Sequence, residues 1–189
     1  MRISHLLLIF FTLPITATAF AEGKSARQLI GACARCHGED GNASGQYPDL
    51  AKQQAEYTFK QLMDFKSGAR KNTQMSPMVG VLSEEDMRTL AEFYAGENLE
   101  RQRGKISDIL GQKGKTIAAQ LNCASCHQPN YRGAATIPRI ARQNRVYLAQ
   151  QMKNFRDGKR TNDNGLKTSF MSNLTDEEIE ALSHYFAGM

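Results

Sequence analysis

Two pentapeptides, Cys33-Ala34-Arg35-Cys36-His37 and Cys123-Ala124-Ser125-Cys126-His127, decide how this chain is organised. Both have the pattern Cys-x-x-Cys-His, and together they use all four cysteines of the 189 residues. The second pentapeptide begins 90 residues after the first. Because an uncommon pattern recurs at this long spacing, we expect the chain to contain two copies of one structural unit.

Residues beyond the cysteines support this duplication. A shift of 90 residues superimposes identical residues at nine further pairs: Pro48 and Pro138, Ala51 and Ala141, Gln53 and Gln143, Tyr57 and Tyr147, Gln61 and Gln151, Phe65 and Phe155, Gly68 and Gly158, Arg70 and Arg160, and Asn72 and Asn162. Further on the offset is 92, where Leu82 matches Leu174. The second copy has therefore gained two residues between Asn162 and Leu174.

Four cysteines in an exported chain would ordinarily suggest disulfides, but a Cys-x-x-Cys pair followed directly by histidine is the attachment motif of c-type haem. The two thiols add to the vinyl groups of the haem, and the adjacent histidine lies beneath the iron as its proximal ligand. The sequence predicts two covalently bound haem c groups, with these attachment cysteines and ligands: Cys33, Cys36 and His37 for the first haem, and Cys123, Cys126 and His127 for the second.

Other uses of the cysteine pairs fit less well. A zinc ribbon needs its two pairs about 15–20 residues apart, whereas 86 residues separate Cys36 from Cys123. A thioredoxin-like redox pair expects one Cys-x-x-Cys beside a βαβ pattern, which this sequence lacks. We therefore keep the haem interpretation.

The N-terminus has the features of a secretory signal. Met1 and Arg2 precede an apolar run interrupted by Pro14, and Ala19-Phe20-Ala21 forms a small-residue cleavage pattern. We expect residues 1–21 to be a cleaved signal peptide. The formal net charge of +5 for the whole chain becomes +4 without Arg2 and comes with no basic cluster, so we expect no nucleic-acid binding. Because 23% of the residues are charged and the mean hydropathy is −0.49, we expect no further membrane segments.

The secondary structure is expected to be all-α, because no run of alternating β-branched residues is present. We predict a first domain over 22–96, a polar linker over 97–104 and a second domain over 105–189. Each domain should have one helix running into its cysteine pair, one over about 54–65 or 145–155, and a terminal helix starting at a capping box. Domains of about 80 residues have a small protein core, which a haem would complete.

The sixth ligand of the first iron is expected in the loop from Lys71 to Leu82. This loop holds Met75 and Met78, and methionine is the usual partner of histidine in electron-transfer haems. Met78 is followed by an apolar stretch, whereas Met75 lies eight residues before the helix cap Ser83. We therefore predict Met75 as the ligand and Met78 as a packing residue.

With these features in place, the whole mature chain resembles the dihaem cytochrome c4 family, which has two class I cytochrome c domains in tandem. The resemblance rests on the paired haem motifs, on Tyr-x-x-x-Gln-x-x-x-Phe-x-x-Gly-x-Arg in both copies, and on Met75 ahead of Leu82-Ser83. It implies a periplasmic electron carrier without catalytic residues, and backbone near Pro48 and Pro138 that orients each proximal histidine. The implied partners are a quinol-oxidising cytochrome complex as donor and a terminal oxidase or other reductase as acceptor, with membrane contact only through such partners.

The second copy departs from this family at its distal position. The residue matching Met75 is Lys167 at the offset of 92 and Gly165 at the offset of 90. The methionine of this loop, Met171, lies only four residues before the cap Thr175. Three interpretations stay open: Met171 as ligand through a re-routed loop, Lys167 as a neutral amine ligand, or an open or water-bound iron.

The second distal ligand bears on function. Two methionine-ligated haems would give a plain electron shuttle, whereas an unusual second haem favours an asymmetric relay, a small redox enzyme or a dedicated electron acceptor of thiosulfate oxidation. Thiosulfate-oxidising dihaem cytochromes typically have a cysteine distal ligand, and here all four cysteines serve attachment. The remaining histidine of the mature chain, His184, matches Glu92 of the first copy and is expected to be exposed.

Overall fold

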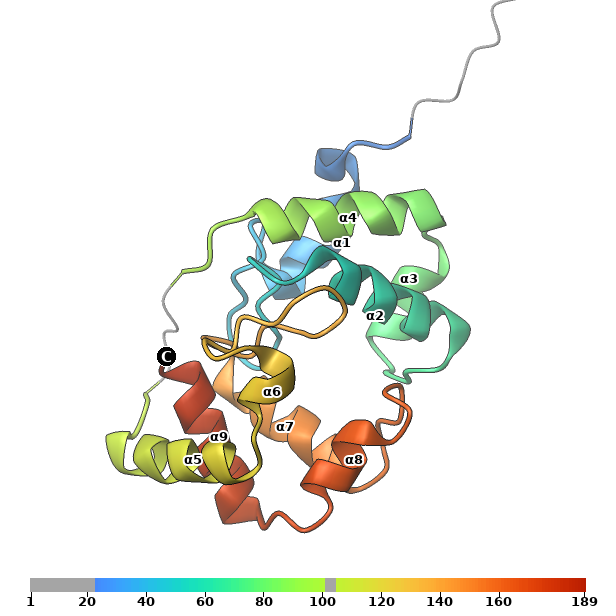
Figure 1. The fold of residues 1–189 in the computed structure, drawn as a ribbon. Helices are drawn as coiled ribbons and strands as arrows, with labels where there is room; N and C mark the ends of the chain where they lie inside the picture. Colours follow the sequence, from blue (N-terminus) through green and yellow to red (C-terminus); the bar gives the residue numbers. More distant parts are fainter. Residues whose placement is uncertain (1–22, 101–104) are drawn as a thin grey trace, which may run out of the picture.

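The computed structural model of the protein describes residues 23–100 and 105–189. Within these ranges the regular structure is helical, apart from one isolated antiparallel bridge between Ala134 and Ile137. The helices follow in chain order as α1 (Ala26–His37), α2 (Ala55–Ser67), α3 (Met75–Gly80), α4 (Glu84–Gly96), α5 (Asp108–Gln120), α6 (Ala124–His127), α7 (Arg145–Arg156), α8 (Leu166–Met171) and α9 (Asp176–Ala187). The all-α prediction is confirmed (Figure 1).

The two halves are built alike. In the first half α4 packs against α1 and α2, and α2 also packs against the short helix α3. In the second half α9 packs against α5 and α7, and α7 packs against the short helix α8. Figure 1 shows the halves as two lobes that lie side by side. The duplication seen in the sequence is thus a duplication of the helix arrangement.

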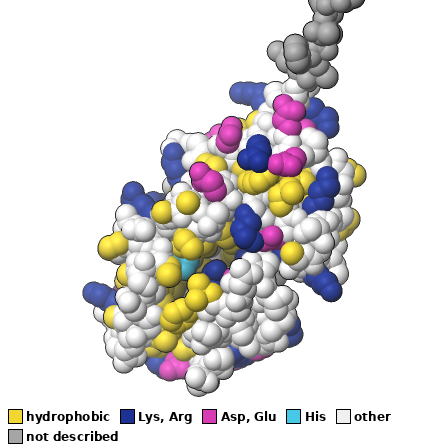
Figure 2. Space-filling view, turned by 45° about the vertical axis from the view of Figure 1, so that its right-hand side comes forward, with side chains coloured by type: hydrophobic (Ala, Val, Ile, Leu, Met, Phe, Trp, Pro, Cys, Tyr) yellow, Lys and Arg dark blue, Asp and Glu magenta, His cyan; other side chains and the backbone are white. Residues whose placement is uncertain are grey.

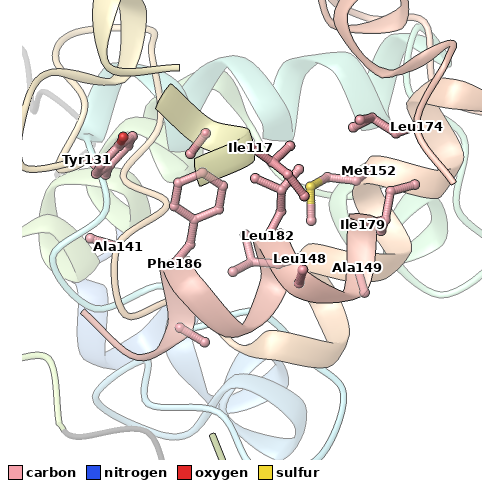
Figure 3. Close-up of a cluster of buried hydrophobic side chains, with 13 residues drawn as sticks. Ile117, Tyr131, Ala141, Leu148, Ala149, Met152, Leu174, Ile179, Leu182 and Phe186 are labelled. Atoms are coloured by element: carbon pink, nitrogen blue, oxygen red, sulfur yellow. The ribbon is translucent and has the colours of Figure 1, made fainter. Parts of the chain in front are cut away.

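Burial follows the helical spacing of apolar residues. Ile179, Leu182 and Phe186 recur three and four residues apart along α9 and are almost completely buried. They meet Ile117 of α5 and Met152 of α7 in the core of the second half (Figure 3). Because side chains at this spacing share one face of a helix, α9 has one stripe that packs inward.

The terminal helices begin at the predicted capping boxes. The Ser83 hydroxyl accepts a hydrogen bond from Asp86 N at 3.0 Å, and the Asp86 carboxylate accepts one from Ser83 N at 2.9 Å. Thr175 and Glu178 repeat this exchange at 3.2 and 2.9 Å. These reciprocal bonds satisfy N–H groups that the helix itself leaves unpaired, and they fix where α4 and α9 start.

Two features differ from the predicted helices. In the second half the helix does not run into the cysteine pair, because α5 ends at Gln120 and Asn122 takes a positive φ of 51° before α6 begins. The loops expected to hold the distal ligands contain the short helices α3 and α8. Both are only six residues long, too short for hydrophobic periodicity to reveal them.

The prediction that His184 is exposed is wrong. His184 is only 7% exposed, and its Nδ1 accepts a hydrogen bond from Ser107 N at 3.0 Å. Its Nε2 lies 3.3 Å from a Glu180 carboxylate oxygen. The segment leading into α5 covers this part of α9, so His184 is buried although its counterpart Glu92 is exposed.

Parts of the predicted domain organisation lie outside the described residues, namely the signal peptide and the linker residues 101–104. The beginning of the linker is tied to the first half, because the Asn42 side chain donates to Asn98 O and accepts from Glu100 N, both at 2.8 Å. Among the helices described, none is long and apolar enough to cross a membrane.

Candidate haem sites

The cysteines predicted to attach haem lie at the ends of helices. Cys33 and Cys36 are one helical turn apart on α1, and His37 is the last residue of that helix. Cys123 is the N-cap of α6, which ends at His127. Each motif contains two of the four cysteines, and all four are free thiols. Each site therefore presents two unpaired thiols and a histidine on one short stretch of helix.

The chain leaves both helices in the same unusual conformation. Gly38 has φ 77° and ψ 156°, and Gln128 has φ 69° and ψ 158°. A Cβ at Gly38 would lie 2.6 Å from Asn42 O, so the first site requires glycine there. This turn directs the following loop back under the histidine in both halves.

Each histidine is held by a proline carbonyl. His37 Nδ1 lies 3.0 Å from Pro48 O, and His127 Nδ1 lies 2.9 Å from Pro138 O. A carbonyl oxygen only accepts, so Nδ1 carries the proton and Nε2 keeps its lone pair. Burial lowers the pKa of both histidines, with the carbonyl hydrogen bond opposing this. Both imidazoles are thus oriented for Nε2 to bind a metal ion, as expected around Pro48 and Pro138.

In the first half, Met75 is the first residue of α3 and is half-buried. The Asn72 side chain accepts a hydrogen bond from Met75 N at 2.8 Å and fixes the start of this helix. Met78, which we expected to pack, is 38% exposed, and the neighbouring Val79 is buried instead. The apolar stretch after Met75 therefore contributes a valine to the core.

In the second half, both candidate ligands lie on α8. Lys167 is the second residue of this helix and Met171 the last. Lys167 Nζ lies 5.4 Å from the centre of the Phe155 ring. Burial lowers the pKa of Lys167, while the nearby Asp163 carboxylate opposes the shift. Met171 is partly buried against the core of the second half.

Two arginines join the halves through a symmetrical network. The Arg70 guanidinium donates to Gln61 Oε1 of its own half at 2.9 Å, and to Tyr147 Oη and Gln151 Oε1 of the other half at 3.0 and 2.8 Å. Arg160 mirrors this arrangement: it donates to Gln151 at 2.9 Å, and to Tyr57 and Gln61 at 3.1 and 2.8 Å. The repeated Tyr, Gln and Arg residues thus form one buried interface.

Two glutamines add a second reciprocal contact. Gln143 Oε1 accepts from Asp49 N at 2.7 Å, and Gln143 Nε2 donates to Asp49 O at 2.8 Å. Gln53 makes the corresponding pair of bonds to Arg139 N and O, at 2.8 and 3.1 Å. Asp49 directly follows Pro48, and Arg139 directly follows Pro138. Each half therefore fixes the backbone beside the carbonyl that holds the other half's histidine.

Arg139 breaks the symmetry of this contact. It is 4% exposed, and its guanidinium donates to Asp49 O and Ala51 O of the first half at 3.1 and 3.0 Å and to Ala141 O at 2.7 Å. Burial lowers its pKa to about 10, against the attraction of the Asp49 carboxylate. Four carbonyls, counting Lys52 O at 3.3 Å, accept from this one side chain.

The residues present fit covalently bound haem. Burial raises the pKa of the Cys33 and Cys123 thiols, so these positions favour uncharged sulfur, as in a thioether. The histidines offer Nε2, and Figure 2 shows a histidine in a hollow lined by hydrophobic side chains. Among the described residues, no three His, Cys, Asp or Glu side chains cluster to hold a bare metal ion. The buried thiols and oriented histidines suit a covalently bound haem.

Comparison with known proteins agrees with this geometry. The family model for cytochrome c matches twice, over residues 20–95 and 111–189. Cytochrome c4 of Azotobacter vinelandii is 33% identical, with 97% of this chain and 98% of the relative covered. The crystal structure of reduced cytochrome c4 from Pseudomonas stutzeri superimposes with a TM-score of 0.80 at 31% identity, covering 87% of this chain and 96% of that one.

A further relative carries a different name. A protein of Stutzerimonas stutzeri named thiosulfate dehydrogenase electron acceptor is 36% identical, with 84% of this chain and 79% of the relative covered.

Fold, sites and relatives together define a c-type cytochrome with two haem-binding domains, an electron carrier rather than an enzyme. The chain belongs to the cytochrome c4 family, and each of its domains binds one haem c covalently.

Sequence reasoning predicted residues for haem attachment but missed how the halves meet. The repeated Tyr57, Gln61 and Arg70 were visible as polar residues kept in both copies, and this was a usable signal for a shared interface. Arg139 had no such signal, because its counterpart in the first copy is the oppositely charged Asp49.

Proposed function

We propose that this chain is a periplasmic electron shuttle whose two haem sites act as one unit. The observation that carries the proposal is the reciprocal contact between the halves, in which Gln143 bonds the backbone of Asp49 and Gln53 bonds that of Arg139. A carrier that passes electrons between two sites needs them held at a fixed separation, and this buried interface supports such a fixed pair.

We assign the residues of each site as follows. Haem supplies each domain with an iron that accepts and releases one electron. The attachment residues are Cys33, Cys36, Cys123 and Cys126, the proximal ligands are His37 and His127, and Met75 is the first distal ligand. The Pro48 and Pro138 carbonyls keep each imidazole in the Nδ1–H tautomer. Such a hydrogen bond fixes the orientation of a metal-bound histidine and raises its basicity.

We propose further that the carrier accepts electrons from a quinol-oxidising cytochrome complex and donates them to a terminal oxidase or another reductase. The N-terminal pattern of residues 1–21 supports export, and a soluble carrier would reach these membrane-bound complexes by diffusion.

The test uses the full-length gene expressed in a bacterium that matures c-type cytochromes. We expect the purified protein to come from the periplasmic fraction, to begin at Glu22, and to contain two haems per chain. When reduced, it should be oxidised rapidly by membranes containing a terminal oxidase. A cytoplasmic protein, or one that such membranes oxidise no faster than heat-treated membranes do, would contradict the proposal.

A second candidate is supported by the relative named thiosulfate dehydrogenase electron acceptor. In this case the chain would take electrons from a thiosulfate-oxidising enzyme. The two functions differ in the electron donor. To distinguish them, the oxidised protein is mixed either with thiosulfate dehydrogenase and thiosulfate or with a quinol-oxidising complex and quinol, and the rate of its reduction is measured. The faster reduction identifies the donor class.

A further inference from the structure

We propose that Lys167, as a neutral amine, is the distal ligand of the second haem iron, while Met171 is a core residue. The inference rests on the proposed haem site of Cys123, Cys126 and His127. It gives the two domains different ligand sets, histidine–methionine in the first and histidine–lysine in the second.

The end of α8 sets the register between the two distal segments. Leu82 N donates to Val79 O at 3.1 Å, and Leu174 N donates to Met171 O at 3.0 Å. Since Leu82 corresponds to Leu174, Met171 occupies the position of Val79. Val79 is 1% exposed and belongs to the core.

A basic latch fixes the same register from outside the segment. Lys66 Nζ donates to Leu82 O in the first half, and Arg156 Nη1 donates to Leu174 O at 3.2 Å in the second. Lys66 and Arg156 are corresponding residues, 90 positions apart. Because this hydrogen bond is present in both halves, the register of α8 is not shifted, and Met171 does not occupy the position of Met75.

The beginning of α8 shows where the two inserted residues are accommodated. Asn164 and Gly165 both have positive φ, 56° and 77°, and form a turn before the helix. The Asp163 carboxylate then accepts a hydrogen bond from Lys167 N, as Asn72 Oδ1 accepts one from Met75 N at 2.8 Å. The insertion is thus absorbed before Lys167, and Lys167 takes the capped position of Met75.

The side chains agree with this register. Met171 packs against the buried cluster of the second half, as a core residue does. Lys167 is half-buried, its Nζ lies 5.4 Å from the Phe155 ring centre, and among described residues Nζ has no hydrogen-bond or ion-pair partner. The Asp163 carboxylate is already used by the backbone N–H groups of Gly165 and Lys167. A deprotonated amine here has a free lone pair for the iron.

The bond that forms is a coordinate bond from Nζ to the iron. The lysine releases one proton to solvent, and no electron is transferred in this step. Amine ligation needs the neutral form of a group whose reference pKa is about 10.4, so iron binding must supply the free energy of deprotonation.

The experiment measures the methionine–iron charge-transfer band of the ferric holoprotein, per haem. With two haems bound per chain, we expect the wild type and Met171→Leu to show the band of one methionine-ligated haem. Lys167→Met should show the band of two such haems, and Met75→Ala should show no band. Lys167→Ala should keep one equivalent and lose the low-spin signal of the second haem in electron paramagnetic resonance.

Other results overturn the inference. Two equivalents in the wild type, loss of half the band in a Met171 variant, or an unchanged second-haem signal in Lys167→Ala would each exclude lysine ligation. Because leucine has nearly the side-chain volume of methionine, Met171→Leu should fold normally. The low-spin signal of its second haem therefore also checks that the second domain is folded. Failure of the underlying haem assignment is distinct, because it would appear as fewer than two haems per chain by mass spectrometry.

Discussion

Replacing Gln143 with alanine is predicted to destabilise the first domain although the substitution lies in the second. Gln143 is 3% exposed, and its Oε1 accepts from Asp49 N and from Asn144 N, both at 2.7 Å. Asp49 O keeps a second donor, Arg139 Nη2 at 3.1 Å. The substitution therefore removes the acceptor that the buried Asp49 N and Asn144 N share.

The expected loss follows from these two donors. A buried donor left without a partner costs about 1–3 kcal/mol. Water entering the space of the lost side chain relieves part of this cost, so we expect a loss of about 2–4 kcal/mol in the free energy of unfolding. This is a large part of the ~5–15 kcal/mol that stabilises a typical domain.

The assay is urea unfolding of the holoprotein, followed by circular dichroism and by the methionine–iron band of the first haem. Gln53→Ala, the counterpart in the other half, should behave similarly. Gln150→Ala is the matched control, because Gln150 is exposed and its side chain donates to Asn154 of its own helix. If Gln143→Ala lost less than about 0.5 kcal/mol, as surface substitutions do, the interface would not couple the halves as described.

Three further predictions concern single sites. Replacing Cys123 and Cys126 together with alanine should halve the haem content, measured by mass spectrometry, and leave the first haem spectrum in place. Thr175→Ala removes the N-cap of α9 and should cost about 1 kcal/mol in thermal unfolding. His184 has a pKa lowered by burial and by Arg145, and its Nδ1 must stay unprotonated to accept from Ser107. Its stabilising contribution is therefore complete above the unfolded pKa of about 6.5 and is lost as the pH falls through the folded pKa. His184→Gln should flatten the loss of stability measured between neutral and mildly acidic pH.

The fold was largely predictable because its signals are local. The capping boxes at Ser83 and Thr175 and the apolar spacing along α4 and α9 depend only on residues close in sequence. The haem motif is likewise contiguous, so Cys33, Cys36 and His37 could be proposed as haem residues without any three-dimensional information.

The contacts between the halves could not be predicted in the same way. They join residues such as Arg139 and Asp49, 90 positions apart, through a side chain that donates to backbone carbonyls, and carbonyls carry no sequence signal. The prediction that His184 is exposed was wrong for a related reason. Its burial depends on the segment around Ser107, which covers α9 only after the second domain has folded.

The distal ligand of the second haem could be predicted only in part from the sequence. Sequence offsets narrowed it to Met171, Lys167 or no side chain, but two inserted residues made the register ambiguous. The backbone hydrogen bond from Leu174 to Met171 and the cap on Lys167 supplied the missing register.

The most direct test of the whole account is a redox titration of the purified dihaem protein with optical detection. Methionine ligation raises a haem's reduction potential, so the account predicts two separate one-electron steps, with the second haem at the lower potential. Lys167→Met should move that lower step upward and leave the other unchanged. A wild-type protein whose two haems titrate together at one potential would contradict the account.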